Sequence, residues 1–151
     1  MTAPSPDLQL SPDFTLRELT ATQVNLPNVP DAREIERLRA LALRILQPPR
    51  DAVGVPVHVS SGFRSAAVNQ AVGGARSSQH RLGEAADIHG VGITSLSLSR
   101  RVVALDLLFD QLIDEFGRWV HLSQGPRHRR QILTAVIRDG RTVYLPGLGH
   151  T

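Results

Sequence analysis

The most informative stretch of this 151-residue chain reads Ser78-Gln79-His80-Arg81-Leu82-Gly83-Glu84-Ala85-Ala86-Asp87. Gly83 predicts a turn between His80 and Asp87, and residues 85–89 predict a strand. An imidazole and a carboxylate on either side of such a turn can bind one metal ion. A loop histidine and a turn aspartate without a metal would look the same, so the interpretation depends on a third ligand.

A hydrolytic zinc site needs three protein ligands and a fourth position open to water. The chain has no cysteine, which leaves His, Asp and Glu as possible ligands. We favour His121, because it lies in the alternating segment 119–123, directly after a predicted strand that ends in Asp114 and Glu115. Antiparallel pairing would bring it beside an acid. The full set of candidates for the third ligand is His58, His89, His121, His128 and His150.

Helices are predicted early in the chain and strands late. The clearest helix begins at Asp31 and runs to residue 46, where Pro48 and Pro49 end its apolar periodicity. This order predicts an α+β fold: a small single domain whose N-terminal helices pack on an antiparallel sheet that carries the zinc site. Short helices are expected at residues 16–20 and 66–72, and a second long helix at residues 97–107. Strands are expected at residues 53–60, 85–89, 109–114, 119–123, 131–138 and 142–145.

The composition is that of one folded globular domain, with 41% hydrophobic and 21% charged residues. We expect a flexible lead-in at residues 1–13 and the domain at residues 14–151. No apolar run is long enough to span a membrane. All 17 basic residues are arginine, and they are scattered, so we expect no nucleic-acid partner. The one dense group, in residues 127–130, is either a solvated loop or a contact for anionic wall polymers.

Further short motifs accompany residues 78–87. They are Ser60-Ser61-Gly62-Phe63-Arg64-Ser65, Val72-Gly73-Gly74, Phe109-Asp110-Gln111-Leu112-Ile113 and Trp119-Val120-His121. The chain is similar to zinc peptidases of the D-alanyl-D-alanine carboxypeptidase and dipeptidase type, which include phage endolysins that cut peptidoglycan peptides. The resemblance implies a small α+β fold, zinc ligands at His80, Asp87 and His121, and a substrate carboxylate held by Arg64.

The general base departs from the common family pattern. Many relatives place an acid three residues before the last histidine, and that position is Arg118 here. Similar sequences of this branch carry a glutamate after the Asp-Gln-Leu-Ile segment, which implies Glu115 as the catalytic base, with Asp114 as the alternative. Adjacent strand residues face opposite sides of a sheet, so only one of the two can reach the site.

Four more residues are candidates for supporting roles. Ser78 and Gln79 could hydrogen-bond the substrate backbone. Trp119 shares a strand face with His121, where it either lines the substrate groove or packs in the core. His89 lies two residues from Asp87, and it either supports that ligand or is simply exposed.

These residues predict a zinc-dependent peptidase that hydrolyses peptidoglycan stem peptides. Glu115 would activate water and Arg64 would anchor a carboxylate. Two alternatives are a structural component of a phage virion or tail, and a metal-binding relic without activity, which Arg118 suggests. Residues 1–10 lack the apolar segment of a secretory signal, so we expect a cytoplasmic protein until lysis releases it or a phage particle carries it.

Overall fold

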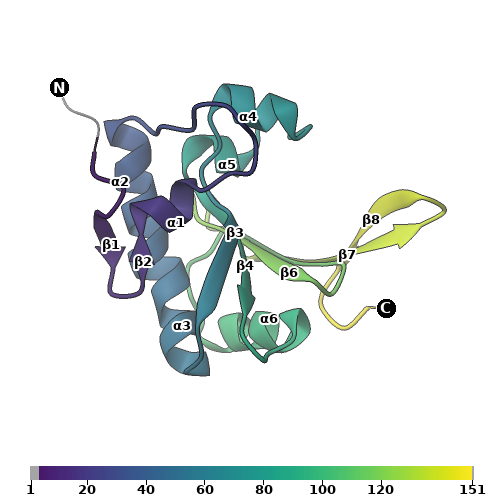
Figure 1. Ribbon diagram of the computed structural model, residues 1–151. Coiled ribbons are helices and arrows are strands. Elements are labelled where there is room, and N and C mark those ends of the chain that lie inside the picture. Colours follow the sequence, from purple (N-terminus) through teal and green to yellow (C-terminus); the bar gives the residue numbers. More distant parts are fainter. Residues whose placement is uncertain (1–3, 151) are drawn as a thin grey trace.

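A six-stranded mixed sheet forms the centre of the computed structural model, which describes residues 4–150 (Figure 1). The strand order is β3-β4-β6-β5-β7-β8. Neighbouring strands are antiparallel except β5 and β7, which run parallel because the loop after β6 crosses to the far side of β5. The strands are β3 (Val57–Ser61), β4 (Ala85–Gly90), β5 (Gln111–Glu115), β6 (Trp119–Ser123), β7 (Gln131–Arg138) and β8 (Arg141–Pro146).

The helices pack against the β3, β4, β6 and β5 part of the sheet, while the β7–β8 hairpin projects from the body as an arm (Figure 1). This arrangement confirms the predicted α+β class, although the sheet is mixed and not purely antiparallel. None of the helices in residues 4–150 is long and apolar enough to cross a membrane. They are α1 (Leu16–Thr20), α2 (Ala32–Leu41), the π-helical segment η1 (Ala42–Leu46), α3 (Gln47–Val53), α4 (Ala66–Ala71), α5 (Gln79–Leu82) and α6 (Ser95–Ala104).

The first long helix continues past the two prolines that were predicted to end it. Asp31 caps its start, since its side chain accepts from Glu34 N and the Glu34 side chain accepts from Asp31 N, both at 2.8 Å. Pro48 and Pro49 lie in the first turn of α3, where a missing N–H is tolerated, and the wider turn of η1 precedes them. The helical run therefore reaches Val53, and β3 starts later than the predicted strand.

Ordered structure begins before residue 14, within the stretch expected to be a flexible lead-in. Strand β1 (Gln9–Ser11) pairs with β2 (Phe14–Thr15). Leu10 is buried in the core, and the Ser11 hydroxyl donates to Gln47 Oε1 at 2.7 Å. Burial of Leu10 beside Phe14 offsets the entropy lost when this segment is ordered.

The central strands present one apolar face and one polar face. Ile88 on β4, Val120 and Leu122 on β6, and Leu112 on β5 are fully buried in the core that the helices cover. The residues between them point to the opposite face of the sheet, because side chains alternate along a strand. That second face carries the functional side chains.

Candidate metal centre

Three predicted ligands converge on the polar face of the sheet. Asp87 on β4 lies directly opposite His121 on β6, so the strand pairing places both side chains on one face. His80 comes from α5, which the Ser78 side chain caps at its start and Gly83 ends with φ of 78°. The short helix and the left-handed glycine thus turn the chain so that His80 and Asp87 meet.

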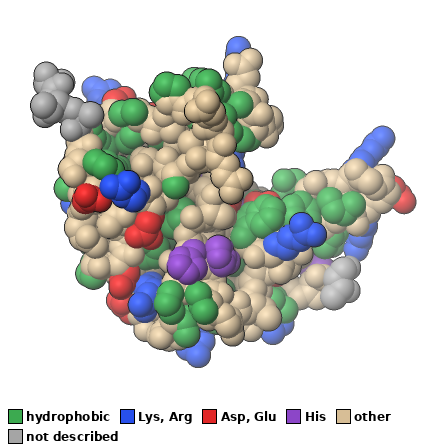
Figure 2. Space-filling view, in the orientation of Figure 1, with side chains coloured by type: hydrophobic (Ala, Val, Ile, Leu, Met, Phe, Trp, Pro, Cys, Tyr) green, Lys and Arg blue, Asp and Glu red, His purple; other side chains and the backbone are tan. Residues whose placement is uncertain are grey.

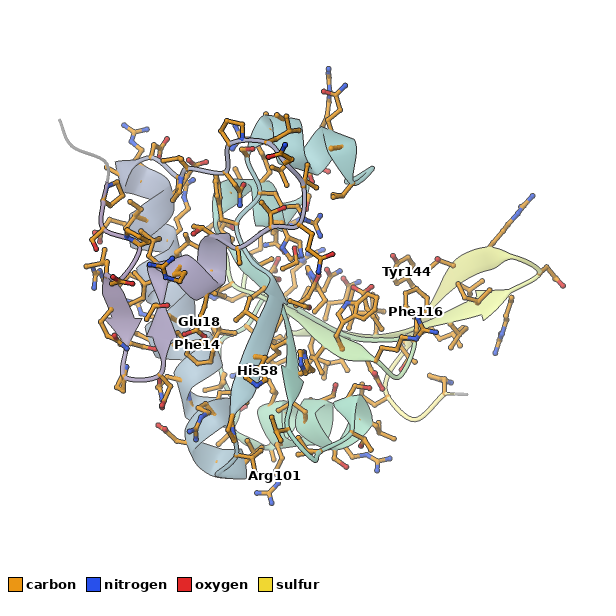
Figure 3. The ribbon with its side chains drawn as sticks, viewed as in Figure 1. Phe14, Glu18, His58, Arg101, Phe116 and Tyr144 are labelled. Atoms are coloured by element: carbon orange, nitrogen blue, oxygen red, sulfur yellow. The ribbon has the colours of Figure 1, made fainter. Side chains whose placement is uncertain are left out.

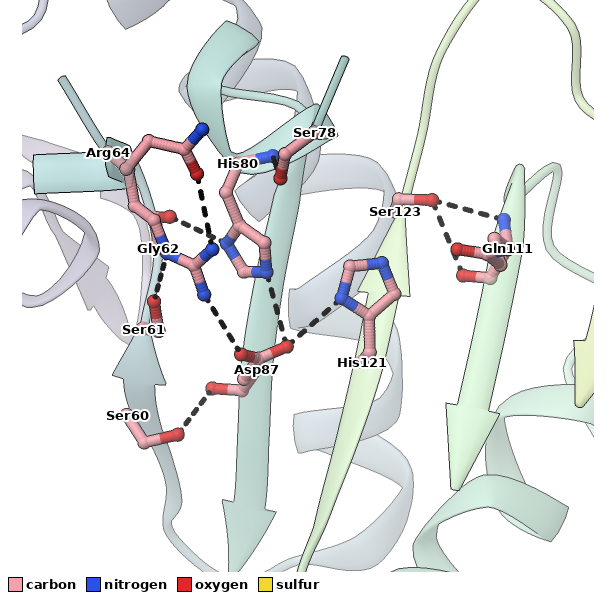
Figure 4. Close-up of polar contacts among 11 residues, drawn as sticks. Ser60, Ser61, Gly62, Arg64, Ser78, His80, Asp87, Gln111, His121 and Ser123 are labelled. Atoms are coloured by element: carbon pink, nitrogen blue, oxygen red, sulfur yellow. Dashed lines mark hydrogen bonds and ion pairs between the residues drawn. The ribbon is translucent and has the colours of Figure 1, made fainter. Parts of the chain in front are cut away.

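The ligand atoms lie close to one carboxylate oxygen (Figure 4). Asp87 Oδ1 is 3.3 Å from His80 Nε2 and 3.0 Å from His121 Nδ1. His80 Nδ1 lies 2.8 Å from the carbonyl oxygen of Gly62. Because a carbonyl oxygen only accepts, Nδ1 carries the proton and the lone pair of Nε2 points toward Asp87.

This arrangement fits a metal ion. Ligands about 2.0 Å from a tetrahedral zinc are separated by roughly 3.3 Å from one another. The ligand atoms of His80, Asp87 and His121 all lie within 4.8 Å of one another, and two of the three separations are near the tetrahedral value. Three lone-pair donors directed at one point repel each other unless a cation lies between them. The group can therefore hold a metal ion.

Asp87 is an anion under ordinary conditions. Burial raises the pKa of its carboxyl, but the neighbouring imidazoles of His121 and His80 outweigh that effect and hold the pKa well below its usual range. The carboxylate is thus ready to bind a cation without first losing a proton.

Gly62 supports the site through a close backbone approach. A Cβ at this position would collide with the backbone carbonyl of Leu19. The same carbonyl accepts a 2.7 Å hydrogen bond from Phe63 N, which fixes the loop after β3. Only glycine leaves room for this contact, so Gly62 holds its own carbonyl in place for His80.

Arg64 lies beside the ligands at the end of this loop. Its guanidinium is 3.9 Å from Asp87 Oδ2 and donates to Ser61 Oγ at 3.2 Å and Asn69 Oδ1 at 3.5 Å. The side chain lines the same pocket as the ligands. Its position allows it to bind an anion next to a bound metal.

The two candidate acids of β5 point to opposite faces of the sheet. Glu115 pairs with Trp119 and lines the pocket, whereas buried Asp114 accepts a 2.6 Å hydrogen bond from Ser95 on α6. Burial first, and the charge of Asp87 second, raise the pKa of Glu115. Arg118 lies in the turn before β6, where its backbone N donates to Glu115 O.

The pocket has a volume of about 480 Å³ and is lined by residues of both the body and the arm. Figure 2 shows the surface hollowed between the body and the arm. Tyr144 of β8 also lines it and lies where the arm leaves the body (Figure 3). Tyr144 pairs with Ala135 on β7, and Ala135 pairs with Glu115 on β5. The three residues therefore lie in one row across the sheet. Sequence reasoning missed Tyr144 because its alternating strand does not reveal which strand it pairs with.

Several predicted residues have protein partners in the structure. Ser78 Oγ accepts from His80 N, and Gln79 Nε2 donates to Asp110 at 2.9 Å, so both polar groups are engaged although both residues line the pocket. Trp119 lines the pocket and packs edge-on against Phe116 at 5.7 Å, and it is not part of the buried core among the described residues.

The other histidines lie outside the three-ligand group. His58 and His89 form an exposed cross-strand pair with ring centroids 5.5 Å apart. His128 Nδ1 lies 2.9 Å from the carbonyl oxygen of Leu108, and His150 Nε2 lies 2.7 Å from that of Pro146. Asp110 is a further residue that sequence reasoning did not assign to the site, and it anchors the loop beside the pocket.

Comparison with known proteins agrees with this geometry. The sequence model of the family described as Peptidase M15 matches residues 12–123, which include all three candidate ligands, Arg64 and Glu115. A comparison with curated proteins finds no match. Peptidases of this family are metal-dependent, and the three-ligand group can supply the metal site. The match covers most of the chain, so the protein belongs to the Peptidase M15 family and is a metallopeptidase.

Proposed function

We propose that the protein is a zinc-dependent peptidase that hydrolyses peptide bonds of peptidoglycan stem peptides. The observation that carries the proposal is the convergence of His80, Asp87 and His121 in one pocket with Glu115 and Arg64. Two imidazoles and one carboxylate form a ligand set typical of catalytic zinc, with a fourth position left for water or substrate.

Each pocket residue has a role in this proposal. Zinc would supply the Lewis acidity that activates water and polarises the scissile carbonyl. Glu115 takes a proton from the attacking water and passes it to the leaving amine. Its raised pKa brings its proton affinity closer to that of water activated by a metal, which suits a general base.

Arg64 supports an acidic peptide as the substrate. Its guanidinium lies beside the ligand group, where a carboxylate near the scissile bond can accept two parallel hydrogen bonds. Peptidoglycan stem peptides offer carboxylates at their C-termini and on D-glutamate. An arginine beside a hydrolytic metal site suits a peptide that carries such carboxylates, and we therefore favour a cell-wall substrate.

Digestion of purified peptidoglycan, followed by mass analysis of the released fragments, tests the proposal. We expect the zinc-loaded protein to release peptide fragments, and a chelator to abolish the release until zinc is restored. Glu115→Gln should bind zinc normally but release almost nothing. Zinc-loaded protein that leaves both peptidoglycan and synthetic stem peptides intact would refute the proposed substrate, while failure to bind zinc would refute the cofactor.

Delivery to the wall by lysis or on a phage particle stays a prediction. A holin gene beside this one would favour an endolysin, and tail genes would favour a virion component. Mass spectrometry of purified particles separates the two, because only a virion component is present in them.

A further inference from the structure

A second cationic group lies at the rim of the same pocket. Residues 124–130 connect β6 to β7, and within this loop Arg127 and Arg129 both line the pocket. The loop is fixed by backbone hydrogen bonds from Arg130 N to Phe109 O and from Gln131 N to Asp110 O. Its arginines are therefore held beside the site.

Asp110 has its hydrogen-bonding capacity filled without Arg127. This fully buried carboxylate accepts from Arg129 N and Nε at Oδ1, at 3.1 and 2.9 Å. At Oδ2 it accepts from an Arg129 terminal nitrogen at 3.0 Å and from Gln79 Nε2 at 2.9 Å. Two carboxylate oxygens offer about four acceptor positions, and these four donors occupy them.

Most hydrogen-bond donors of the Arg127 guanidinium are not used within the described part of the chain. Its one polar contact within residues 4–150 is a 3.5 Å approach to Asp110 Oδ2, and its side chain is 60% exposed. A guanidinium has five N–H donors, so most of them face the pocket rim and solvent. Arg129, in contrast, is committed to Asp110 through a bidentate pair.

Arg127 and Arg64 have different polar partners among residues 4–150. Arg64 contacts Ser61, Asn69 and Asp87, whereas the one polar contact of Arg127 is its approach to Asp110. The two arginines come from different loops, the one after β3 and the one after β6, and both line the pocket. Two separate guanidinium groups in one pocket fit a ligand with two carboxylates.

We propose that Arg127 binds a second, internal carboxylate of the substrate, so that the enzyme prefers stem peptides with an unamidated glutamate. This inference rests on the proposed function. A glutamate linked through its γ-carboxyl keeps a free α-carboxylate in mid-chain, and amidation removes that charge. A charge-assisted hydrogen bond at a partly exposed arginine should give about a tenfold preference.

Two synthetic stem peptides that differ only in this group test the inference. One carries the free α-carboxylate and the other the amide, and kcat/KM is measured for both with the zinc-loaded protein. We expect the acid to be preferred about tenfold. Arg127→Gln should bring the two values within about twofold, chiefly by raising KM for the acid, and Arg127→Lys should restore part of the preference.

Arg130→Gln is the matched control. It removes an arginine from the same loop, but Arg130 pairs with Asp106 at 2.8 Å and does not line the pocket. This variant should keep the wild-type preference. Equal kcat/KM values for the two peptides in the wild type, or an unchanged preference in Arg127→Gln, would overturn the inference.

A binding measurement separates this inference from the proposed function. Trp119 is the only tryptophan and lines the pocket, so its fluorescence reports ligand binding. If neither peptide is hydrolysed, the proposed function fails. Tighter binding of the acid that is lost in Arg127→Gln would then still support the carboxylate site, and equal binding of both peptides would reject it.

Discussion

The two faces of strands β4, β5 and β6 use the same backbone for opposite purposes. On one face Ile88, Val120 and Leu122 are buried under the helices. On the other face Asp87, His121 and Glu115 line a pocket. A shift of one residue along any strand would exchange the two sets, so the apolar face fixes the register that brings the polar residues together.

His121→Ala is the largest test of this contrast. It should remove one of three ligands, so bound metal and peptide hydrolysis fall to background, while the free energy of unfolding of the metal-free protein changes by about 1 kcal/mol or less. Metal analysis, the peptide assay and urea unfolding measure the three quantities. A variant that retains full metal and full activity would show that the ligand set is wrong.

Glu115→Gln should leave the metal in place and lower kcat by about 10²- to 10⁴-fold, because a general base is lost. Wild-type activity should also decline as the pH falls through the raised pKa of Glu115, where the base becomes protonated. The rate of the variant should lack this acidic limb in a pH profile.

Asp114→Asn is the matched control for Glu115 on the other face. It weakens the buried contact with Ser95, so we expect about 1–2 kcal/mol less stability and nearly unchanged activity. If Asp114→Asn were inactive and Glu115→Gln active, the assignment of the two faces would be reversed.

Leu122→Ala tests the apolar face at the neighbour of His121. Leu122 is fully buried, and truncation should lower the free energy of unfolding by about 2–5 kcal/mol. Protein that remains folded should still bind metal with normal stoichiometry. Selective loss of metal without loss of stability would contradict the division between the two faces.

The smallest expected effect is a loss of stability at low pH that depends on Asp110. Arg129 hydrogen bonds, which outweigh the effect of burial, lower the pKa of Asp110 from 3.8 to about 2. Its contribution to stability is therefore complete above about pH 4 and is lost as the pH falls toward 2. Asp110→Asn should be less stable at pH 7 and lose less stability over that interval. Parallel acid unfolding curves for the two proteins would exclude this contribution.

Local patterns in the sequence predicted the α+β class, the turn at Gly83 and most of the strands. They also singled out His80 and Asp87 and favoured His121 among five histidines, and the family resemblance implied all three as ligands; the structure brings them together. These features depend on neighbours in sequence or on one antiparallel pair. Alternation along β5 predicted that only one of Glu115 and Asp114 can point into the pocket as the general base. The structure adds which of the two side chains lies on that face.

Long-range contacts could not be predicted in the same way. The parallel pairing of β5 with β7 depends on where the loop after β6 crosses, and the position of Tyr144 depends on that pairing. Pro48 and Pro49 were interpreted as the end of a helix. The helix accommodates them because the wide turn of η1 precedes them, and the sequence pattern does not reveal that turn. The partner of Gln79, Asp110, lies 31 residues away.

The family match ends at residue 123, but Arg127, Arg129 and Tyr144 of the pocket lie beyond it. The three candidate ligands and this part of the pocket wall are thus encoded in consecutive segments, which the pairing of β5 with β7 and the contacts of Arg129 with Asp110 hold together. Substitution of the exposed side chains Arg127 and Tyr144 would therefore change the pocket wall while these contacts and the ligands stay in place.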